Sequence, residues 1–343
     1  METQQPINPS KILQTGTGFF NSKTLLTAVN MGLFTVLGDN KMSGKDIQKN
    51  LGLHDRSLYD FLDALVAMAF LERTGTKTTA IYSNAPDSNL FLDKNKPTYV
   101  GGILEMCNNR LYPFWNNLEA GLKTGLPQNE TKNGGKPFFE EIYADPKKLK
   151  EFVSGMAGVQ MGNFITFAKQ FDFSNYKSLC DIGGAGGHLS AQVAMHNKHI
   201  KCTSFDLPAV TPIAKEVIST MHLNDGVQVV NGDFFVDDLP KADVITMGNV
   251  LHDWSKKDKR MLVQKAYDAL PKGGTFVVIE NIIDNDRREN HFGLLMSLNM
   301  LIETPEGYDF SFSDFQELCV AAGFSKTSIM PLIGPTSAAI AIK

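Results

Sequence analysis

SLCDIGGAGGHL, residues 178–189, carries the strongest structural signal in this chain. An apolar run ends at Asp181, passes through four glycines and enters a segment with helical character. Glycine lets the backbone turn tightly and lets a ligand approach where a Cβ atom would block it. Turns of this kind lie at the carboxyl edge of a parallel sheet, where nucleotide-like ligands bind. The stretch therefore predicts a strand, a ligand-binding turn and a helix.

Three later motifs follow apolar runs in the same way: DLP at 206–208, GDFF at 232–235 and VLHDW at 250–254. From residue 177 onward, apolar runs alternate with helical patterns, as in a doubly wound parallel sheet. The runs are residues 178–182, 201–205, 227–230, 243–247, 275–280, 326–331 and 337–342. We expect an α/β domain with a doubly wound, seven-stranded Rossmann-like sheet.

In this order and spacing, the glycine turn, DLP, GDFF and LHDW resemble the motifs of class I S-adenosylmethionine-dependent methyltransferases. More narrowly, nearly the whole chain is similar to the cation-independent O-methyltransferases, which include plant caffeic acid, acetylserotonin and bacterial small-molecule O-methyltransferases. The resemblance implies S-adenosyl-L-methionine as the cofactor and a hydroxyl of an aromatic or polyketide/quinone-type small molecule as the acceptor. It also implies a role in secondary metabolism and a homodimer.

The cofactor-binding residues that the resemblance implies lie in and around these motifs. Asp206 ends the second run, about 20 residues past the turn, where an acid can bind the ribose hydroxyls through its two oxygens. In GDFF the acid can accept from the adenine amino group, and Phe234 can lie against the ring. The expected set is Asp181, Gly183, Gly184, Asp206, Leu207, Gly232, Asp233, Phe234, Met247 and Gly248.

Each of these assignments has an alternative. The turn could bind a dinucleotide, but Leu189 stands where that signature has its third glycine. Asp206 could cap a helix, with Pro208 as the first helical residue. Gly248 stands where many members of the family carry a lysine or arginine, so one cofactor contact is expected to be lost or made by the backbone.

His252 is the residue to which the resemblance gives catalysis, as the general base. Glu280, at the end of the run 275–280, is expected to hydrogen-bond the histidine, which fixes the tautomer of its ring. The alternatives are a structural histidine and a charged strand end that faces water. Asp253 could be catalytic or could cap the helix that starts near Ser255. The second acid found in plant members falls near Phe312 and is therefore expected to be missing.

The acceptor pocket is expected to be lined by two amphipathic stripes, although most such stripes are plain core. Methionine adapts to flat ring faces and so suits an aromatic acceptor. The expected lining is Met156, Gln160, Met161, Phe164, Met296, Asn299 and Met300. No metal site is expected, because His196 and His199 share their spacing with no carboxylate or cysteine.

The N-terminal region shows three helical patterns and a wing. Residues 21–37, 43–51 and 55–71 have helical spacing, Ser43 is placed as an N-cap, and 78–90 hold turn residues typical of a hairpin. We expect three parts: a winged-helix dimerisation domain at 1–97, a helical connector with the pocket helices at 98–170, and the Rossmann-like catalytic domain at 171–343.

A winged helix could also belong to a ligand-sensing transcription regulator. Its third helix would then need basic side chains to approach phosphates. The segment 55–73 has four acids against Arg56 and Arg73 and a broad apolar face, which suits a subunit interface better. A methyltransferase-fold protein that acts on carbon or nitrogen acceptors is a further alternative.

Composition excludes several classes of protein. The 343 residues are 43% hydrophobic and carry a net charge of −4. The chain therefore has no excess positive charge that would attract it to nucleic acid or anionic membranes. No apolar run reaches 18 residues, and the N-terminus lacks the apolar core of a signal peptide. The four cysteines are scattered, without a metal or disulfide pattern. We expect a cytoplasmic protein whose partner is a small-molecule acceptor, with no nucleic acid and no membrane.

Overall fold

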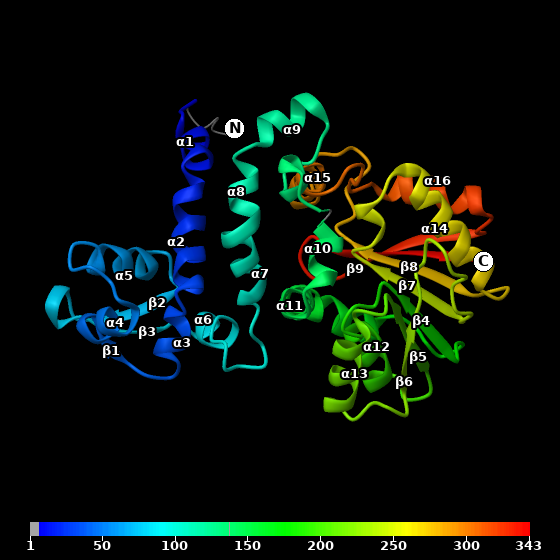
Figure 1. The fold of residues 1–343 in the computed structure, drawn as a ribbon, viewed down its shortest axis with the longest axis horizontal. Coiled ribbons are helices and arrows are strands. Elements are labelled where there is room, and N and C mark those ends of the chain that lie inside the picture. Colours follow the sequence, from blue (N-terminus) through cyan, green and yellow to red (C-terminus); the bar gives the residue numbers. More distant parts are fainter. Residues whose placement is uncertain (1–6, 137) are drawn as a thin grey trace, which may run out of the picture. The chain divides into compact units, whose positions relative to one another are not determined.

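The computed structural model describes residues 7–136 and 138–343. The chain separates into two compact units, Met1–Pro113 and Phe114–Lys343, and both can be followed by colour in Figure 1. The three-part division at residues 97 and 170 stays a prediction. No helix in the described part of the chain is long and apolar enough to cross a membrane.

The first unit is a small helical domain with a three-stranded antiparallel sheet, ordered β1-β3-β2. Its elements are α1 (Ser10–Gly16), α2 (Gly18–Asn30), α3 (Leu33–Leu37), β1 (Met42–Ser43), α4 (Gly44–Leu51), α5 (Leu58–Ala67), β2 (Leu71–Thr74), η1 (Lys77–Thr79), β3 (Ile81–Asn84), α6 (Pro86–Phe91), α7 (Gly101–Met106) and the π-helical η2 (Cys107–Leu111). The core packs α2, α3, α4 and α5 against β2 and β3.

The predicted N-terminal elements are present with shifted bounds. Ser43 caps α4 as expected, because its hydroxyl accepts from Asp46 N. The single helix expected at 21–37 is wrong, because Gly32 takes a φ of 75° and separates α2 from α3. The wing is the β2–β3 hairpin, so the predicted range 78–90 covers only its second strand.

The second unit begins with helices that precede the sheet. They are α8 (Tyr112–Trp115), which crosses the unit boundary, α9 (Leu118–Thr124), η3 (Glu130–Asn133), α10 (Phe138–Ala144) and α11 (Pro146–Gln170). Asp145 caps the long helix α11, since its carboxylate accepts from the amides of Lys147 and Lys148, and Pro146 occupies the first turn.

The seven-stranded sheet has the order β6-β5-β4-β7-β8-β10-β9. Its strands are β4 (Ser178–Ile182), β5 (Lys201–Asp206), β6 (Val227–Asn231), β7 (Val244–Gly248), β8 (Thr275–Glu280), β9 (Lys326–Pro331) and β10 (Ser337–Ile342). The seven expected strands are confirmed. The first five run parallel, whereas β10 is antiparallel to both its neighbours, so the sheet is not wholly parallel.

Helices cover both faces of this sheet. They are α12 (His188–His196), α13 (Thr211–Thr220), η4 (Leu251–Asp253), α14 (Lys256–Ala269), α15 (His291–Glu303) and α16 (Phe312–Ala322). Side chains alternate along each strand: Phe276 and Val278 join the core under α14 and α16, whereas Val277 and Ile279 join the core under α12 and α13 (Figure 1).

The strand order reverses at β4, because β5 and β6 extend to one side and β7 and β8 to the other. Ligands of open α/β sheets bind outside the carboxyl ends of the strands at such a switch point. Ile182, Asp206, Asn231, Gly248 and Glu280 end the five parallel strands, so all five lie at this edge. The topology thus brings the sequence motifs to one edge of one sheet.

Candidate active site

Several positions of the glycine turn between β4 and α12 leave no room for a side chain. Gly183 and Gly187 have φ of 70° and 73°, and a Cβ at Gly184 would overlap Ser204 Oγ. The amides of Gly183 and Gly184 both donate to the Phe205 carbonyl, at 2.9 and 3.2 Å. The turn is therefore fastened to β5 through its backbone.

Asp206 is placed beside this turn. Its Oδ2 accepts from Ala185 N at 2.8 Å and its Oδ1 from Leu207 N at 2.7 Å. Burial raises the pKa of Asp206, and these two amides oppose the rise. Each oxygen keeps further acceptor capacity, as a vicinal diol requires. The helix-cap interpretation is wrong, because α13 starts at Thr211 with Val210 at its N-cap.

Asp181 is buried near the end of β4 and faces Thr246 in the register of β4 and β7. Thr246 Oγ1 donates to Asp181 Oδ1 at 2.8 Å. Burial raises the pKa of Asp181 to about 7, the Thr246 hydroxyl opposes the rise, and the charge of Asp206 adds to it. Two carboxyl groups thus flank the glycine turn in a site of low polarity.

The segment 232–235 continues the same edge. Gly232 N donates to the Asp206 carbonyl at 3.0 Å, and a Cβ at Gly232 would overlap the Phe205 ring. Asp233 Oδ1 accepts from Phe235 N at 2.8 Å, so the carboxylate caps its own turn. Phe234 is partly buried, and its ring centroid lies 5.9 Å from that of Trp254. The segment holds an acid and an aromatic ring at the position where the resemblance implies the adenine.

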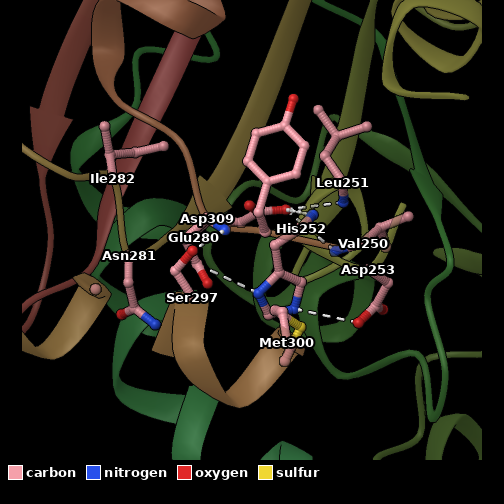
Figure 2. A network of polar contacts seen from close by, with 12 residues as sticks. Val250, Leu251, His252, Asp253, Glu280, Asn281, Ile282, Ser297, Met300 and Asp309 are labelled. Carbon is pink, nitrogen blue, oxygen red and sulfur yellow. Dashed lines mark hydrogen bonds and ion pairs between the residues drawn. The ribbon is translucent and has the colours of Figure 1, made fainter. Parts of the chain in front are cut away.

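His252 stands in η4, directly after β7, and is buried. Its Nδ1 lies 3.3 Å from Asp309 Oδ1, and its Nε2 lies 3.7 Å from Asp253 Oδ1. Figure 2 shows both contacts as dashed lines from the ring. Since 3.7 Å is too long for a hydrogen bond, Asp309 is the hydrogen-bond partner of the ring, and Nε2 makes no hydrogen bond within the described residues. We call His252, Asp253, Glu280 and Asp309 the acid–base cluster.

Glu280 holds the backbone that carries the histidine. Its Oε1 accepts from the amides of Val250, Leu251 and His252 at 3.2, 2.8 and 3.3 Å. The expected hydrogen bond from Glu280 to the imidazole is therefore replaced by bonds to the turn, and the partner of the ring is Asp309. Glu280 is 1% exposed, so these bonds are shielded from water.

The expectation that a second acid is missing is wrong. Asp309 lies three residues before Phe312, in the segment that leads into α16. Ile283 N donates to the Phe310 carbonyl at 3.0 Å, which fastens this segment to the chain that follows β8. Ser311, rather than the acid, begins the helix as its cap. The predicted position near Phe312 is therefore three residues too late in the chain. The cap interpretation of Asp253 is also wrong, because Ser255 caps α14.

The electrostatics of the acid–base cluster favour a protonated histidine. Burial alone lowers the pKa of His252, but Asp253, Asp309 and Glu280 together outweigh it and raise the pKa to about 10. Burial raises the pKa of Glu280 to about 7 and that of Asp253 to about 6, against the attraction of His252. The direction of these shifts favours the imidazolium form of the ring.

Ligand atoms of His252, Glu280 and Asp309 all lie within 4.8 Å of one another, so in the described chain they form a group that could hold a metal ion. Glu280 Oε1, which accepts from three amides, and His252 Nδ1, which meets Asp309, are already engaged within the described residues. That no metal binds here stays a prediction.

The expected acceptor-lining residues lie on α11 and α15. A Cβ at Gly248 would be 3.7 Å from Phe164, so α11 passes over the end of β7. Figure 2 shows Met300 of α15 beside the His252 ring, and α15 packs against η4. Asn299 Oδ1 accepts from Trp115 Nε1 at 2.9 Å, and Gln160 Oε1 accepts from Asn163. Phe164 and Met300 thus border the carboxyl edge of the sheet. The remaining members are Met156, Met161 and Met296, which are partly buried.

The comparisons with known proteins identify the family of the chain. Residues 115–325 match the model of the O-methyltransferase domain, and residues 13–94 match the O-methyltransferase dimerisation domain. The tetracenomycin polyketide synthesis 8-O-methyl transferase TcmO of Streptomyces glaucescens is 36% identical, over 98% of this chain and 97% of its own. The N,N-dimethyltransferase OxyT of Streptomyces rimosus is 32% identical, over 94% and 93%.

Among solved structures, human N-acetylserotonin methyltransferase in complex with S-adenosylmethionine superimposes with a TM-score of 0.91 at 26% identity, covering 100% of this chain and 99% of that one. Fold and site define a class I methyltransferase. The chain belongs to the O-methyltransferase family and is an S-adenosylmethionine-dependent O-methyltransferase.

Proposed function

We propose that this enzyme methylates a hydroxyl of an aromatic or polyketide/quinone-type small molecule and that His252 is its general base. The observation that carries the catalytic assignment is the buried contact between His252 Nδ1 and Asp309, which leaves Nε2 without a hydrogen bond in the described chain. The relatives support the class of acceptor, since TcmO is named as a polyketide 8-O-methyltransferase.

The glycine turn, Asp181, Asp206 and Asp233 fit the proposed cofactor site. Cβ atoms at Gly183 and Gly184 would overlap Val250 and Ser204, so these two positions present backbone alone, and the carboxylates of Asp206 and Asp233 keep free acceptor capacity. We assign the same site to Gly183, Gly184, Leu207, Gly232, Phe234, Met247 and Gly248. S-Adenosylmethionine supplies an activated methyl group on a sulfonium. The chain's own task is to hold the acceptor oxygen in line and to take its proton.

The raised pKa of His252 suits a phenol as the acceptor. An ordinary histidine near 6.5 is about 3.5 units below a phenol near 10, and a complete proton transfer would cost roughly 5 kcal/mol. The neighbouring carboxylates raise the pKa of His252 and so reduce this cost. The ligand-free ring must first release its own proton, so turnover should rise as the pH increases above neutral.

We further propose a homodimer formed through the first unit. Support comes from the match to the dimerisation domain and from large apolar side chains that α1 and α2 expose, among them Leu13, Phe19 and Phe20. The regulator alternative loses support, because α5 presents Asp60 and Asp63, and Asp63 is paired with Arg73. Location in the cytoplasm stays a prediction.

A nitrogen acceptor is the second candidate, because OxyT is named as an N,N-dimethyltransferase. One experiment separates the two. The enzyme is incubated with S-adenosylmethionine and matched pairs of hydroxylated and aminated aromatics and quinones, with and without EDTA, and the products are read by mass. We expect methyl gain on hydroxyl acceptors that EDTA does not change. Methylation of the amines alone would contradict the O-methyl assignment, and loss of activity with EDTA would contradict metal independence.

A further inference from the structure

Lys259 is a lysine in a core position. The buried side of α14 consists of residues 259, 262, 263, 266 and 269, and every member except Lys259 is apolar. Lys259 is 0% exposed. A buried ammonium is costly unless it is paired and hydrogen-bonded, so a lysine at this position calls for a role that an apolar residue could not fill.

The ammonium of Lys259 joins two segments that are far apart in the sequence. Its Nζ donates to the Trp254 carbonyl at 2.6 Å and to the Tyr308 carbonyl at 3.0 Å, and it lies 3.5 Å from the centroid of the Tyr308 ring. Trp254 is two residues after His252, and Tyr308 directly precedes Asp309. Two carbonyls and one ring face account for the three N–H donors of an ammonium.

The same two segments touch directly. Tyr308 N donates to the His252 carbonyl at 2.8 Å, and a Cβ at Gly307 would lie only 2.7 Å from that carbonyl. The backbones of His252 and Tyr308 therefore meet where Lys259 ties their neighbours together. A shift of one segment against the other would change the distance between the His252 ring and Asp309.

Lys259 is also a buried positive charge beside the acid–base cluster. Burial lowers its pKa to about 8, against the attraction of Glu280, Asp309, Asp253 and Asp258. In the described chain, Glu280 Oε2 and Asp309 Oδ2 are buried without hydrogen-bond partners. The acid–base cluster holds three carboxyl groups and one imidazole, so a second cation offsets the negative charge of the carboxyl groups that are ionised.

We propose that Lys259 is a positioning residue for methyl transfer, which clamps the His252 and Asp309 segments in register and supplies the buried positive charge that balances the acid–base cluster. The proposal rests on the role of His252 given above. The charged and titratable groups that bear on the cluster are Asp253 of η4, Glu280 of β8, Asp309 before α16, Asp258 and Lys259 of α14, and Tyr143 of α10, whose pKa is raised by burial and by Asp206 and Asp253.

The test compares Lys259→Met with a matched control, Lys343→Met. Lys343 Nζ also donates to two carbonyls, of Tyr267 and Leu270, and lies 4.3 Å from the centroid of a tyrosine ring. Its backbone meets Gly274, before the start of β8, whereas Glu280 ends that strand. Lys343→Met thus removes a similar clamp far from the acid–base cluster.

For Lys259→Met we expect kcat at pH 7 to fall by about 10- to 100-fold, as a small misplacement of reacting groups produces. The dissociation constant of S-adenosylhomocysteine should stay within about twofold. Removing a positive charge strengthens proton binding by every titratable group nearby. In the profile of kcat against pH, the apparent pKa of the rising limb should therefore increase by about one unit or more. Lys343→Met should change neither kcat nor that limb, and Lys259→Arg should keep the parental limb.

A loss of kcat that is the same at every pH, or a parental kcat, would overturn the proposal. If Lys259→Met does not fold, Lys259→Gln and Lys259→Arg are compared instead, and equal pH profiles for the two would overturn it. His252→Gln is measured in parallel. Parental turnover in that variant would contradict the general base itself, whereas a defect in His252→Gln with none in Lys259→Met would contradict only the role of Lys259.

Discussion

The cofactor side and the acid–base side of the sheet edge are built in different ways. On the cofactor side, the glycine turn, Asp206 and Gly232 lie at the ends of three adjacent parallel strands and bind one another through backbone amides. On the acid–base side, His252 and its partner Asp309 are 57 residues apart and meet through one side-chain contact. Glu280 and Lys259 reach the backbone around them from two further segments. The residues of the cofactor side thus lie in short sequence motifs. The residues of the acid–base side are far apart in the sequence and come together only when the chain folds.

This difference predicts that variants on the two sides will separate binding from turnover. Asp309→Asn should lower kcat by about 10²- to 10³-fold, because an amide in place of the carboxylate no longer fixes the ring or stabilises the imidazolium. Binding of S-adenosylhomocysteine, measured by calorimetry, should stay within about twofold.

Asp314→Asn is the matched control for Asp309→Asn. Asp314 lies in the same segment and forms the capping box of α16 with Ser311. Its loss should cost about 1 kcal/mol of stability and leave kcat almost unchanged. Equal turnover of the two variants would show that Asp309 is only structural.

Asp206→Ala should give the opposite pattern. We expect S-adenosylhomocysteine to bind more than about tenfold more weakly, since 1.4 kcal/mol of lost hydrogen bonding corresponds to a factor of ten. At saturating cofactor, kcat should stay within a few-fold of the parent. Asp225→Ala, at an exposed position before β6, should have no effect. A selective loss of kcat in Asp206→Ala would place Asp206 on the catalytic side.

Asp181→Asn should change stability in a pH-dependent way. Burial raises the pKa of Asp181 from its ordinary 3.8 to about 7, so the folded protein binds the proton more tightly than the unfolded chain. The contribution of Asp181 to the free energy of unfolding has its full value below about pH 4 and is lost as the pH rises through about 7. The Tm of Asp181→Asn relative to the parent should therefore increase between pH 5 and pH 8.5. A constant difference would contradict the raised pKa.

The smallest effect is expected for Gly248→Ala. The nearest atom to its new Cβ is Phe164 Cε1 at 3.7 Å, an ordinary contact, whereas a Cβ at Gly184 would overlap Ser204 Oγ. We expect Gly248→Ala to keep kcat and cofactor binding within about threefold and Gly184→Ala to lose cofactor binding by more than about tenfold. If both glycines tolerate alanine, the close-packed turn is not needed for the cofactor.

The strands, the glycine turn and the position of His252 could be predicted from the sequence, because each is marked by a local pattern of apolar runs, glycines and a strand-end acid. Asp309 could not, because its place depends on how the segment before α16 is fastened beside β8, which no spacing encodes. Glu280 was placed at the right strand end, but its bonds go to backbone amides, which have no sequence signature. Lys259 is visible in the sequence as one charged residue in the apolar stripe of α14. A lysine is ordinarily expected to face solvent, so the sequence alone does not predict its burial.

The most direct measurement of the central claim is the turnover of His252→Gln relative to the parent over a series of phenols of increasing pKa, at saturating S-adenosylmethionine. On a phenol whose pKa is near 10, the variant should be slower by a factor of about 10² to 10⁴, the usual worth of a positioned general base. The deficit should shrink for acceptors that are already ionised at the assay pH, because they have no proton to lose. Near-parental turnover of His252→Gln on the least acidic phenol would contradict the general-base role of His252.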